Sequence, residues 1–380
     1  MKLTDAQQDL EHEVAAWVAK AVAEIGPPPA DEAAAFAREV AWERRVHAAG
    51  YAGLHWPVAF GGRGATIVEH YIVMQAFGHA MAPEGANNIG RELVAPILLH
   101  AGTEAQKRRF VPAIAAGTDI WCQGFSEPGA GSDLASVATR ADPARDGWTI
   151  SGQKIWTTNA QYSDWCLVLA RTDRDAPRHA GLTLFLVPMS APGVTVRPIR
   201  QITGQSSFNE VFFDAVAVGD DLRLGGVNQG WQVANRVLAF ERGTTRLYRQ
   251  ARFASELTAV IGLLGTGADA ERVGRLVARL HVLRLQNEAL VERVAAGEAI
   301  GGEASLQKLA WSELHHDMMR EALDLGGQAA VTDPAWGWVR KTYLKAQAET
   351  IYAGSTEIQL SIIADQVLGL PRAGRSAASA

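Results

Sequence analysis

The chain contains little cysteine, no long apolar run and no strong excess of either charge. Only two of its 380 residues are cysteines, Cys122 and Cys166, which fits a reducing compartment. These two could lie on adjacent strands, but a disulfide is the less favoured alternative. No apolar run approaches the ~20 residues that span a bilayer, and segment 1–7 has the pattern of a helix start, not of a signal peptide. With a composition rich in Ala, Arg and Gly, these absences predict a bacterial cytoplasmic protein that does not span a membrane.

The balance of charges and the scarcity of metal-binding residues argue against two further classes of protein. The net charge of -5 argues against nucleic acid as the main partner, although a local basic patch for phosphate groups is compatible with that total. No cluster of Cys and His has the spacing of metal ligands, so we predict no metal site. A chain with 48% hydrophobic and 20% charged residues is typical of a globular protein, and 380 residues predict two or three packed units.

The order of the periodic segments predicts an α+β fold with three domains. Residues 1–118 have helical periodicity, with capping-box patterns at Thr4/Gln7 and Thr103/Gln106. Residues 119–225 change to the patterns of strands, and residues 226–380 return to helix.

Individual elements follow from the same patterns. We expect a helix from 31 to 49, and strands at 147–152, 165–170, 182–187 and 210–214. The polar segment 173–181 predicts an exposed hairpin loop. A long helical region, 231–296, is broken near 262–267. A last helix is expected to be capped by Thr356 and to end at Gly369.

Two short motifs carry the chemistry of the chain. Segment 125–133 reads FSEPGAGSD, in which small residues allow backbone N–H groups to approach an anion and the Ser126 and Ser132 hydroxyls add donors. Segment 154–159 reads KIWTTN, and on a strand Trp156 and Thr158 point to the same side. Glu127 and Asp133 are predicted to hydrogen-bond the loop itself. The two motifs together predict a site for a flat ring system that carries a diphosphate.

These motifs resemble those of the acyl-CoA dehydrogenase family, and the resemblance extends over nearly the whole chain. It implies an N-terminal α-helical domain, a middle β-barrel or β-sheet domain and a C-terminal four-helix bundle. The implied activity is FAD-dependent dehydrogenation of an acyl-CoA thioester to the trans-2-enoyl-CoA, with hydride passing to flavin N5. An electron-transfer flavoprotein is the implied acceptor of the electrons.

The resemblance also assigns residues to the cofactor by their position in the motifs. Trp156 is implied to lie against the isoalloxazine, and Thr158 to donate near N5. Ser132 is implied to contact the pantetheine arm of the substrate as well. Gln123 departs from the family, in which an aromatic residue is common there. The full set implied to bind FAD is Gln123, Phe125, Ser126, Gly131, Ser132, Trp156, Thr158, Ser355 and Glu357.

The usual catalytic carboxylate of the family is missing from this chain. Many relatives place it in a Tyr-Glu-Gly-Thr turn, but the matching segment 351–357 reads IYAGSTE, with Ala353 at the position of the base. The backbone N–H of Ala353 remains and is implied to bind the substrate carbonyl. A minority of relatives carry the base at an earlier Glu-Arg pair, which Glu241 and Arg242 match. We therefore predict that Glu241 removes the α-proton and that Arg242 contacts the substrate; the alternative for both is a surface ion pair, for Glu241 with an Arg such as Arg246.

Two segments that serve the flavin of a neighbouring subunit in homomeric relatives are altered. Segment 262–269 lacks the Arg and Phe of an Arg-x-Phe-Gly motif. Segment 323–329 has Leu323 and Ala329 where a Gln-x-x-Gly-Gly-x-Gly motif has Gln and the last Gly. This loss favours a heteromer, such as an α2β2 assembly with a related chain of the kind that some relatives acting on bulky or steroid acyl groups form. A homodimer or homotetramer remains the alternative.

Two other functions remain open at this stage. The missing acid at Ala353 is compatible with a non-catalytic or half-site subunit of a heteromeric acyl-CoA dehydrogenase. A flavin monooxygenase or oxidase on the same fold would need no α-proton base, although the loop at 125–133, with its implied CoA binding, favours the dehydrogenase.

Overall fold

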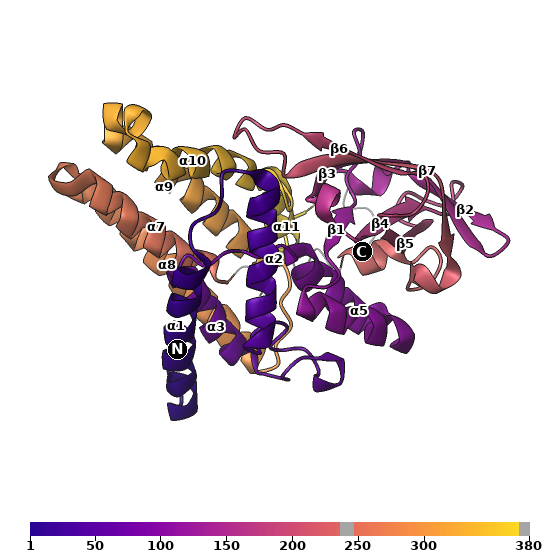
Figure 1. The fold of residues 1–380 in the computed structure, drawn as a ribbon, viewed down its shortest axis with the longest axis horizontal. Helices are drawn as coiled ribbons and strands as arrows, with labels where there is room; N and C mark the ends of the chain where they lie inside the picture. Colours follow the sequence, from indigo (N-terminus) through magenta and orange to yellow (C-terminus); the bar gives the residue numbers. More distant parts are fainter. Residues whose placement is uncertain (236–246, 372–380) are drawn as a thin grey trace. The chain divides into compact units, whose positions relative to one another are not determined.

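The computed structural model describes residues 1–235 and 247–371 (Figure 1). The contacts within the chain form two compact units. We call the one that comprises residues 23–65 and 83–240 the sheet unit, and the one that comprises residues 1–22, 66–82 and 241–380 the helical unit. The α+β architecture predicted from the sequence is confirmed. Among the described residues, no helix is both long and apolar enough to cross a membrane.

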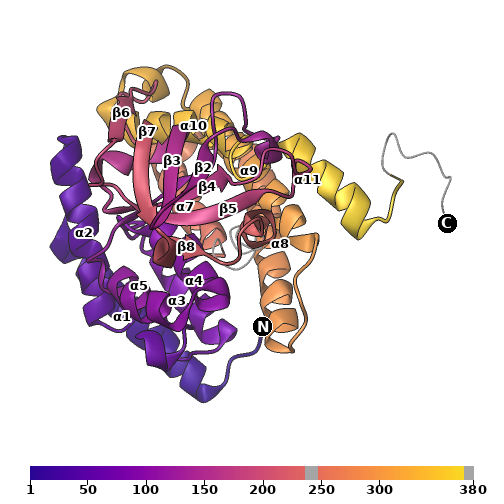
Figure 2. The ribbon, with the colours of Figure 1, turned by 90° about the vertical axis from the view of Figure 1, so that its right-hand side faces the viewer.

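The sheet unit contains one eight-stranded sheet in the order β6-β7-β3-β2-β4-β5-β8, with β1 paired to β4 (Figure 2). Its strands are β1 (Trp121–Gly124), β2 (Arg140–Ala144), β3 (Gly147–Thr158), β4 (Trp165–Arg171), β5 (Leu182–Pro188), β6 (Val194–Ile199), β7 (Phe208–Gly219) and β8 (Arg223–Leu224). The side chains of β4 and β5 are buried along almost their whole length, as their uninterrupted apolar sequences predict.

The four predicted strands correspond to β3, β4, β5 and β7. The loop between β4 and β5 joins an antiparallel pair, as predicted for segment 173–181. The short strands β1, β2, β6 and β8 were not anticipated, because a strand of two to six residues shows too few alternations to identify and is defined by its pairing partner. β1 forms by parallel pairing to β4, which places Cys122 opposite Cys166. Both thiols are free and buried.

The helices described in the sheet unit include α2 (Glu32–Ala48), α4 (Ala95–Ala101) and α5 (Glu104–Ala116). Two of them, α2 and α5, begin at caps that the sequence indicates. Asp31 caps α2 by accepting a hydrogen bond from the Ala34 N–H at 2.8 Å. Thr103 and Gln106 form the predicted capping box of α5, and Gly117 ends that helix with φ of 64°.

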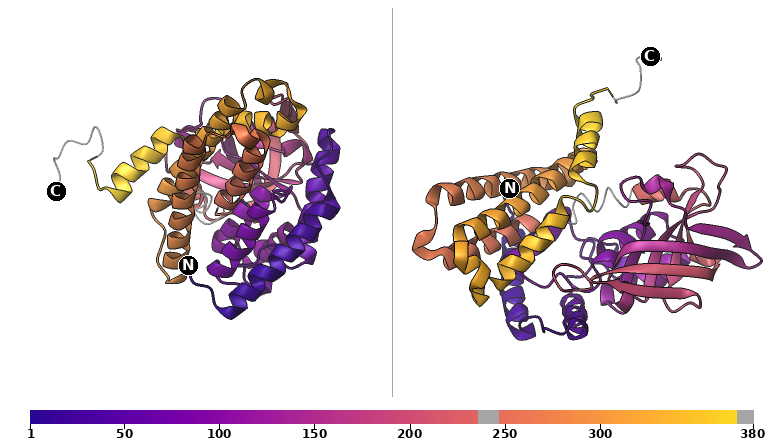
Figure 3. Two further views of the ribbon diagram at one scale, coloured as in Figure 1. Left: turned by 90° about the vertical axis from the view of Figure 1, so that its left-hand side faces the viewer. Right: turned by 90° about the horizontal axis from the view of Figure 1, so that it is seen from above.

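The helical unit is built from helices, and those of its C-terminal part are the orange and yellow ribbons of Figure 3. Its helices are α1 (Asp5–Ile25, of which residues 5–22 belong to this unit), α3 (Ile67–His79), α7 (Arg249–Leu264), α8 (Ala270–Ala295), α9 (Glu303–Thr332), α10 (Gly337–Glu349) and α11 (Thr356–Ile362). The Thr4/Gln7 capping box at the start of α1 is present, as predicted. Helix α9 contacts α7, α8, α10 and α11, and its Trp311, Leu314 and Met318 are buried in the core of this unit.

Two predictions about the helix boundaries can be compared with the structure. The predicted break near 262–267 is confirmed, because α7 ends at Leu264 and Gly265 has φ of 54°. The predicted cap of the last helix was wrong by one residue. Ser355 is extended (φ -61°, ψ 163°) and its hydroxyl accepts from the Ile358 N–H, whereas Thr356 is already helical. Serine and threonine both have a hydroxyl that can cap a helix, so the backbone conformation decides which of the two residues is the N-cap.

Candidate functional site

The glycine-rich loop 125–133, which is predicted to bind the flavin and is called the flavin loop below, follows β1 directly in the sheet unit. Gln123 lies on β1 and is half-buried, while Phe125, after the end of the strand, is 4% exposed. The carbonyl oxygen of Ser126 accepts a hydrogen bond of 2.9 Å from the Ile155 N–H of β3. The loop is therefore joined to the strand that carries Trp156 and Thr158, so the two sequence motifs are neighbours in space.

Neither the backbone conformation of this loop nor its packing requires glycine at positions 129 and 131. The loop closes with reciprocal backbone hydrogen bonds between Glu127 and Ala130, of 2.9 and 3.0 Å. Neither Gly129 nor Gly131 has a positive φ, and a Cβ added at either would meet no atom within 4 Å. Neither conformational strain nor packing within the chain requires a glycine there. The open backbone fits close approach by an external group such as a diphosphate.

A buried ion pair holds the loop against β3. Lys154 has 0% of its side chain exposed, and its Nζ donates to the Phe125 carbonyl at 3.0 Å and to Glu127 Oε1 at 2.7 Å. Glu127 also accepts from the backbone N–H groups of Ala138 at 2.6 Å and Thr139 at 2.9 Å. Glu127 thus has a structural role, as predicted, but its side chain bonds Lys154 and the segment that follows the loop, not residues of the loop itself.

The charges of this pair stabilise each other in spite of their burial. Burial alone would raise the pKa of Glu127, but the Lys154 charge and the hydrogen bonds outweigh it and lower that pKa. Burial lowers the pKa of Lys154, and the Glu127 carboxylate offsets part of that shift. A buried pair of this kind is strongly destabilised when one partner is removed.

A bulge in β3 turns Trp156 outward. The register with β7 shifts between Lys154 and Thr157, and Trp156 has φ of 61° in the left-handed region. The Trp156 side chain is 56% exposed, with its ring edge-on to Phe208 at 6.1 Å between ring centroids. Thr157 is buried and Thr158 is half-buried. Because the bulge interrupts the alternation of the strand here, the shared side of Trp156 and Thr158 stays a prediction. An exposed tryptophan in a strained conformation is typical of a ligand-binding position rather than of a core.

The far end of the loop is exposed and polar. Ser132 and Asp133 are exposed, and Asp133 pairs with Arg178 from the loop between β4 and β5. Arg171, at the end of β4, donates to the backbone carbonyls of Ala135 at 2.6 Å and Val137 at 3.2 Å. Two guanidinium groups therefore contact segment 133–137.

The remaining predicted site residues described by the structure lie in the helical unit, in the turn between α10 and α11. Ala353 has φ of 54° and Gly354 has φ of 89°. Ser355 is the N-cap of α11, and Glu357 lies in its first turn. A hydrogen bond from the Glu357 backbone N–H, together with the Ser355 hydroxyl, lowers the pKa of the Glu357 carboxyl. Glu241 and Arg242 lie outside the described residues, as does Arg246, so their roles stay predictions.

Both altered family motifs coincide with breaks in the helices. Gly265 follows the end of α7, and Gly327 interrupts α9 with φ of 51°. The backbone turns are thus present, whereas the Arg, Phe and Gln side chains of the family motifs are not.

Sequence reasoning missed the roles of several buried charged residues. Lys154 precedes the apolar Ile155 and Trp156 on β3, and His315 occupies a position on the same face of α9 as Trp311 and Met318. A charged residue on an apolar face was the available signal. Its partners come from distant parts of the chain, so the signal does not identify them.

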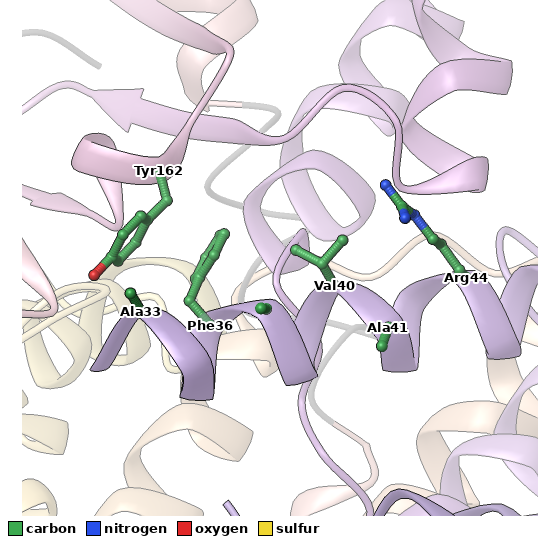
Figure 4. A pocket seen from close by; sticks show the side chains of 7 residues that line it. Ala33, Phe36, Val40, Ala41, Arg44 and Tyr162 are labelled. Carbon is green, nitrogen blue, oxygen red and sulfur yellow. The ribbon is translucent and has the colours of Figure 1, made fainter. Parts of the chain in front are cut away.

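A shallow apolar groove lies along α2 in the sheet unit and contains none of the predicted site residues (Figure 4). Phe36 stacks on Tyr162 there, with 4.4 Å between ring centroids. Its lining residues are Ala33, Phe36, Ala37, Val40, Ala41, Arg44 and Tyr162.

Comparison with known proteins identifies the class to which this fold and site belong. Three family models match the chain in order: acyl-CoA dehydrogenase N-terminal domain over residues 4–118, middle domain over 122–216 and C-terminal domain over 228–368. The chain belongs to the acyl-CoA dehydrogenase family, and the resemblance drawn from its motifs is confirmed. It is thus an oxidoreductase of the acyl-CoA dehydrogenase class, as predicted.

Individual relatives are similar over nearly the full length. Acyl-CoA dehydrogenase IpdE1 of Mycobacterium tuberculosis is 44% identical over 90% of this chain and 91% of that protein. The solved structure named Tcur3481-Tcur3483 steroid ACAD superimposes with a TM-score of 0.87 and 27% identity, over 98% of this chain and 99% of that one. The ChsE4-ChsE5 complex of Mycobacterium tuberculosis gives a TM-score of 0.85 and 28% identity, over 98% of this chain and 100% of that one.

Proposed function

We propose that this chain carries out the FAD-dependent α,β-dehydrogenation of an acyl-CoA thioester. The observation that supports the proposal best is the flavin loop, with its open Gly129 and Gly131 backbone, joined by Lys154 to the strand from which Trp156 turns outward. These residues fit a diphosphate and a flat ring. We assign the FAD contacts to Gln123, Phe125, Ser126, Gly131, Ser132, Trp156, Thr158, Ser355 and Glu357.

In this proposal, proton transfer and carbonyl polarisation are performed by the chain itself. Bound FAD supplies the electron sink for the hydrogen that leaves the β-carbon. Glu241 accepts the α-proton as the general base. The Ala353 N–H donates a hydrogen bond to the thioester oxygen, on which negative charge develops, and Arg242 contacts the substrate.

We further propose that the substrate carries a bulky, steroid-type acyl group and that a related chain completes the enzyme. One structural relative is named a steroid ACAD, and both solved relatives named above carry the names of two proteins. The missing Arg, Phe and Gln at 262–269 and 323–329 fit a chain whose counterpart supplies them. An electron-transfer flavoprotein is the proposed acceptor.

Flavin content is the first test of this proposal. The chain is purified alone and together with a related acyl-CoA dehydrogenase chain from the same organism, and the FAD absorbance per protein is compared. We expect little FAD in the chain alone and FAD with substrate-dependent bleaching in the pair. A CoA thioester of a steroid side-chain acid should be converted to its 2-enoyl product faster than octanoyl-CoA. Stoichiometric FAD in an active homotetramer would overturn the heteromer, and bleaching by neither thioester would overturn the dehydrogenase.

Changing Trp156 to Ala separates ligand binding from folding. Because the side chain is 56% exposed, we expect the free energy of unfolding to change by less than about 1 kcal/mol. Loss of its stacking face should weaken FAD binding about tenfold. Titration of apoprotein with FAD and chemical denaturation measure the two effects. Trp121, which is 1% exposed, is the matched control: its change to Ala should cost about 3–5 kcal/mol. An unchanged FAD affinity in the Trp156 variant would remove this residue from the flavin site.

One observation favours a second candidate, a half-site subunit without catalytic activity. Ala353 stands where many relatives carry the base. In that case the chain would bind a partner and hold its flavin loop, but changing Glu241 would leave the activity of the assembly unaltered.

A further inference from the structure

Buried charged side chains from three helices of the helical unit form a connected network. The imidazole of His315, on α9, lies between two carboxylates. Its Nδ1 is 2.6 Å from Glu349 Oε2 on α10, and its Nε2 is 3.0 Å from Glu256 Oε2 on α7. The three side chains are only 5–8% exposed. Phe253 of α7 stacks on the imidazole, with 4.1 Å between ring centroids.

This geometry favours an imidazolium. A neutral imidazole has one N–H and one lone pair, so it donates to only one of two flanking carboxylates. Burial alone would lower the pKa of His315, but Glu349 and Glu256 reverse that effect and raise it to about 9. Burial would raise the pKa of Glu349, and the charges of His315 and Arg249 instead lower it to about 2.

Other cations accompany this group from two of the helices. On α7, Arg249 pairs with Glu349 at 2.9 Å and Arg252 with Glu256 at 3.3 Å. On α9, Lys308 lies 5.9 Å from the centre of the Trp311 ring. Both carboxylates therefore face a cation besides His315.

The other carboxylate oxygen of Glu349, Oε1, connects this network to the turn that follows α10. Glu349 Oε1 accepts from Arg249 Nη1, and Arg249 Nη2 donates to the Tyr352 hydroxyl at 3.2 Å. The guanidinium of Arg249 lies over the Trp311 ring at 4.0 Å, which limits its movement. The position of Tyr352 thus depends on Glu349, which His315 holds from the opposite side.

The turn itself needs such support. Ala353 has φ of 54°, in the left-handed region. This conformation is unfavourable for a residue with a Cβ and is kept only where neighbouring groups stabilise it. From the helix side, the buried Gln359 donates to the carbonyls of Ala353 at 2.9 Å and Gly354 at 3.1 Å. Tyr352 directly precedes Ala353, and Arg249 binds its hydroxyl. With a methyl group in place of the usual base, the N–H of Ala353 is the main group that this turn can offer a substrate, so its direction matters.

We propose that protonated His315 is a positioning residue that, through Glu349, Arg249 and Tyr352, fixes the direction of the Ala353 N–H for the thioester carbonyl. The inference rests on the proposed function for the identity of the ligand, whereas the network belongs to the protein itself. His315 touches neither the turn nor a reacting atom, so its effect is transmitted through these three residues.

The test compares His315→Gln with His316→Gln. His316 is the matched control, because it neighbours His315 on the same helix but bonds Gln347 at 3.1 Å and is partly exposed. Each variant is purified as the flavin-loaded enzyme, with a partner chain if one is needed. The probe is a CoA thioester with a ¹³C-labelled carbonyl, and the readouts are its infrared stretching frequency, kcat and KM.

In the wild type and in His316→Gln, we expect the bound carbonyl frequency to be lowered by the hydrogen bond. In His315→Gln it should return toward the free value, with kcat lowered roughly tenfold and KM little changed. A carbonyl shift in His315→Gln equal to that of the wild type would overturn the inference. Absence of a shift in the wild type would instead count against the proposed function.

Stability as a function of pH checks the network without any ligand. Below the ordinary His pKa of 6.5, the imidazole is protonated in both the folded and unfolded chain, so its full contribution is present. Between 6.5 and about 9, the unfolded chain releases the proton and the folded chain keeps it, so stability falls as pH rises. We expect this fall in the wild type and in His316→Gln and its loss in His315→Gln; equal slopes in all three would overturn a protonated His315.

A second variant, Tyr352→Phe, tests the proposal in case His315→Gln does not fold. Tyr352→Phe removes the link between Arg249 and the turn but leaves every buried charge paired. We expect the same rise in carbonyl frequency and a smaller fall in kcat. If Tyr352→Phe has the frequency and kcat of the wild type, the proposed transmission is wrong.

Discussion

Changing Glu241 to Gln is expected to lower kcat by about 10³-fold while substrate affinity and FAD content stay close to those of the wild type. The glutamine has nearly the same shape but cannot accept the α-proton, so an interaction of the transition state is removed and ground-state binding is kept. Stopped-flow measurement of flavin bleaching gives the rate of the chemical step, and titration with the acyl-CoA gives its Kd.

Two controls make the Glu241 result specific. Glu271→Gln makes the same chemical change at an exposed position in the first turn of α8, where 84% of the side chain is exposed, and should leave kcat unchanged. Glu241→Asp keeps a carboxylate at a shorter reach and should retain more activity than Glu241→Gln. Full activity in Glu241→Gln would exclude this residue as the base and favour the half-site subunit.

Changing Lys154 to Met is expected to destabilise the protein by about 3 kcal/mol at neutral pH. Lys154 is fully buried, and the change leaves the Glu127 carboxylate buried without its counter-ion. Because Lys154 also donates to the Phe125 carbonyl, the flavin loop loses a link to β3, and FAD should dissociate faster. Urea denaturation and the rate of FAD release measure the two effects.

The dependence on pH and a double variant test the physical cause. In the wild type the pKa of Glu127 is lowered, so its contribution to stability is present above the ordinary value of 4.5 and is lost as pH falls through the lower folded pKa. The cost of Lys154→Met should therefore shrink in acid, where Glu127 takes up a proton. Removing both charges in Lys154→Met/Glu127→Gln should recover part of the stability.

A partly exposed ion pair provides the comparison for Lys154. Lys107→Met breaks the pair with Glu104, in which the Lys107 and Glu104 side chains are 18% and 61% exposed, and should change stability by less than about 1 kcal/mol. Equal costs for Lys107→Met and Lys154→Met would contradict the view that burial makes the Lys154 pair important.

The parts of the site that depend on local chemistry could be predicted from the sequence. The capping boxes at Thr4 and Thr103, the strands that contain Trp156 and Val168, and the glycine-rich loop all depend on residues close together in the chain. The extended backbone of Ser355 could not be predicted, because Ser355 and Thr356 are both good caps and the preceding turn determines which is used.

The sequence by itself determined the family and the α+β architecture and predicted which loop binds the flavin, because motifs and periodicity are local and can be identified without knowledge of contacts. Only the tertiary structure decided which charges are buried together. Glu256, His315 and Glu349 lie 59 and 34 residues apart, and nothing in the spacing of charges along single helices selects these partners. The packing of α7, α9 and α10 brings them together and removes them from water, and the two carboxylates outweigh the effect of burial and raise the pKa of His315 to about 9.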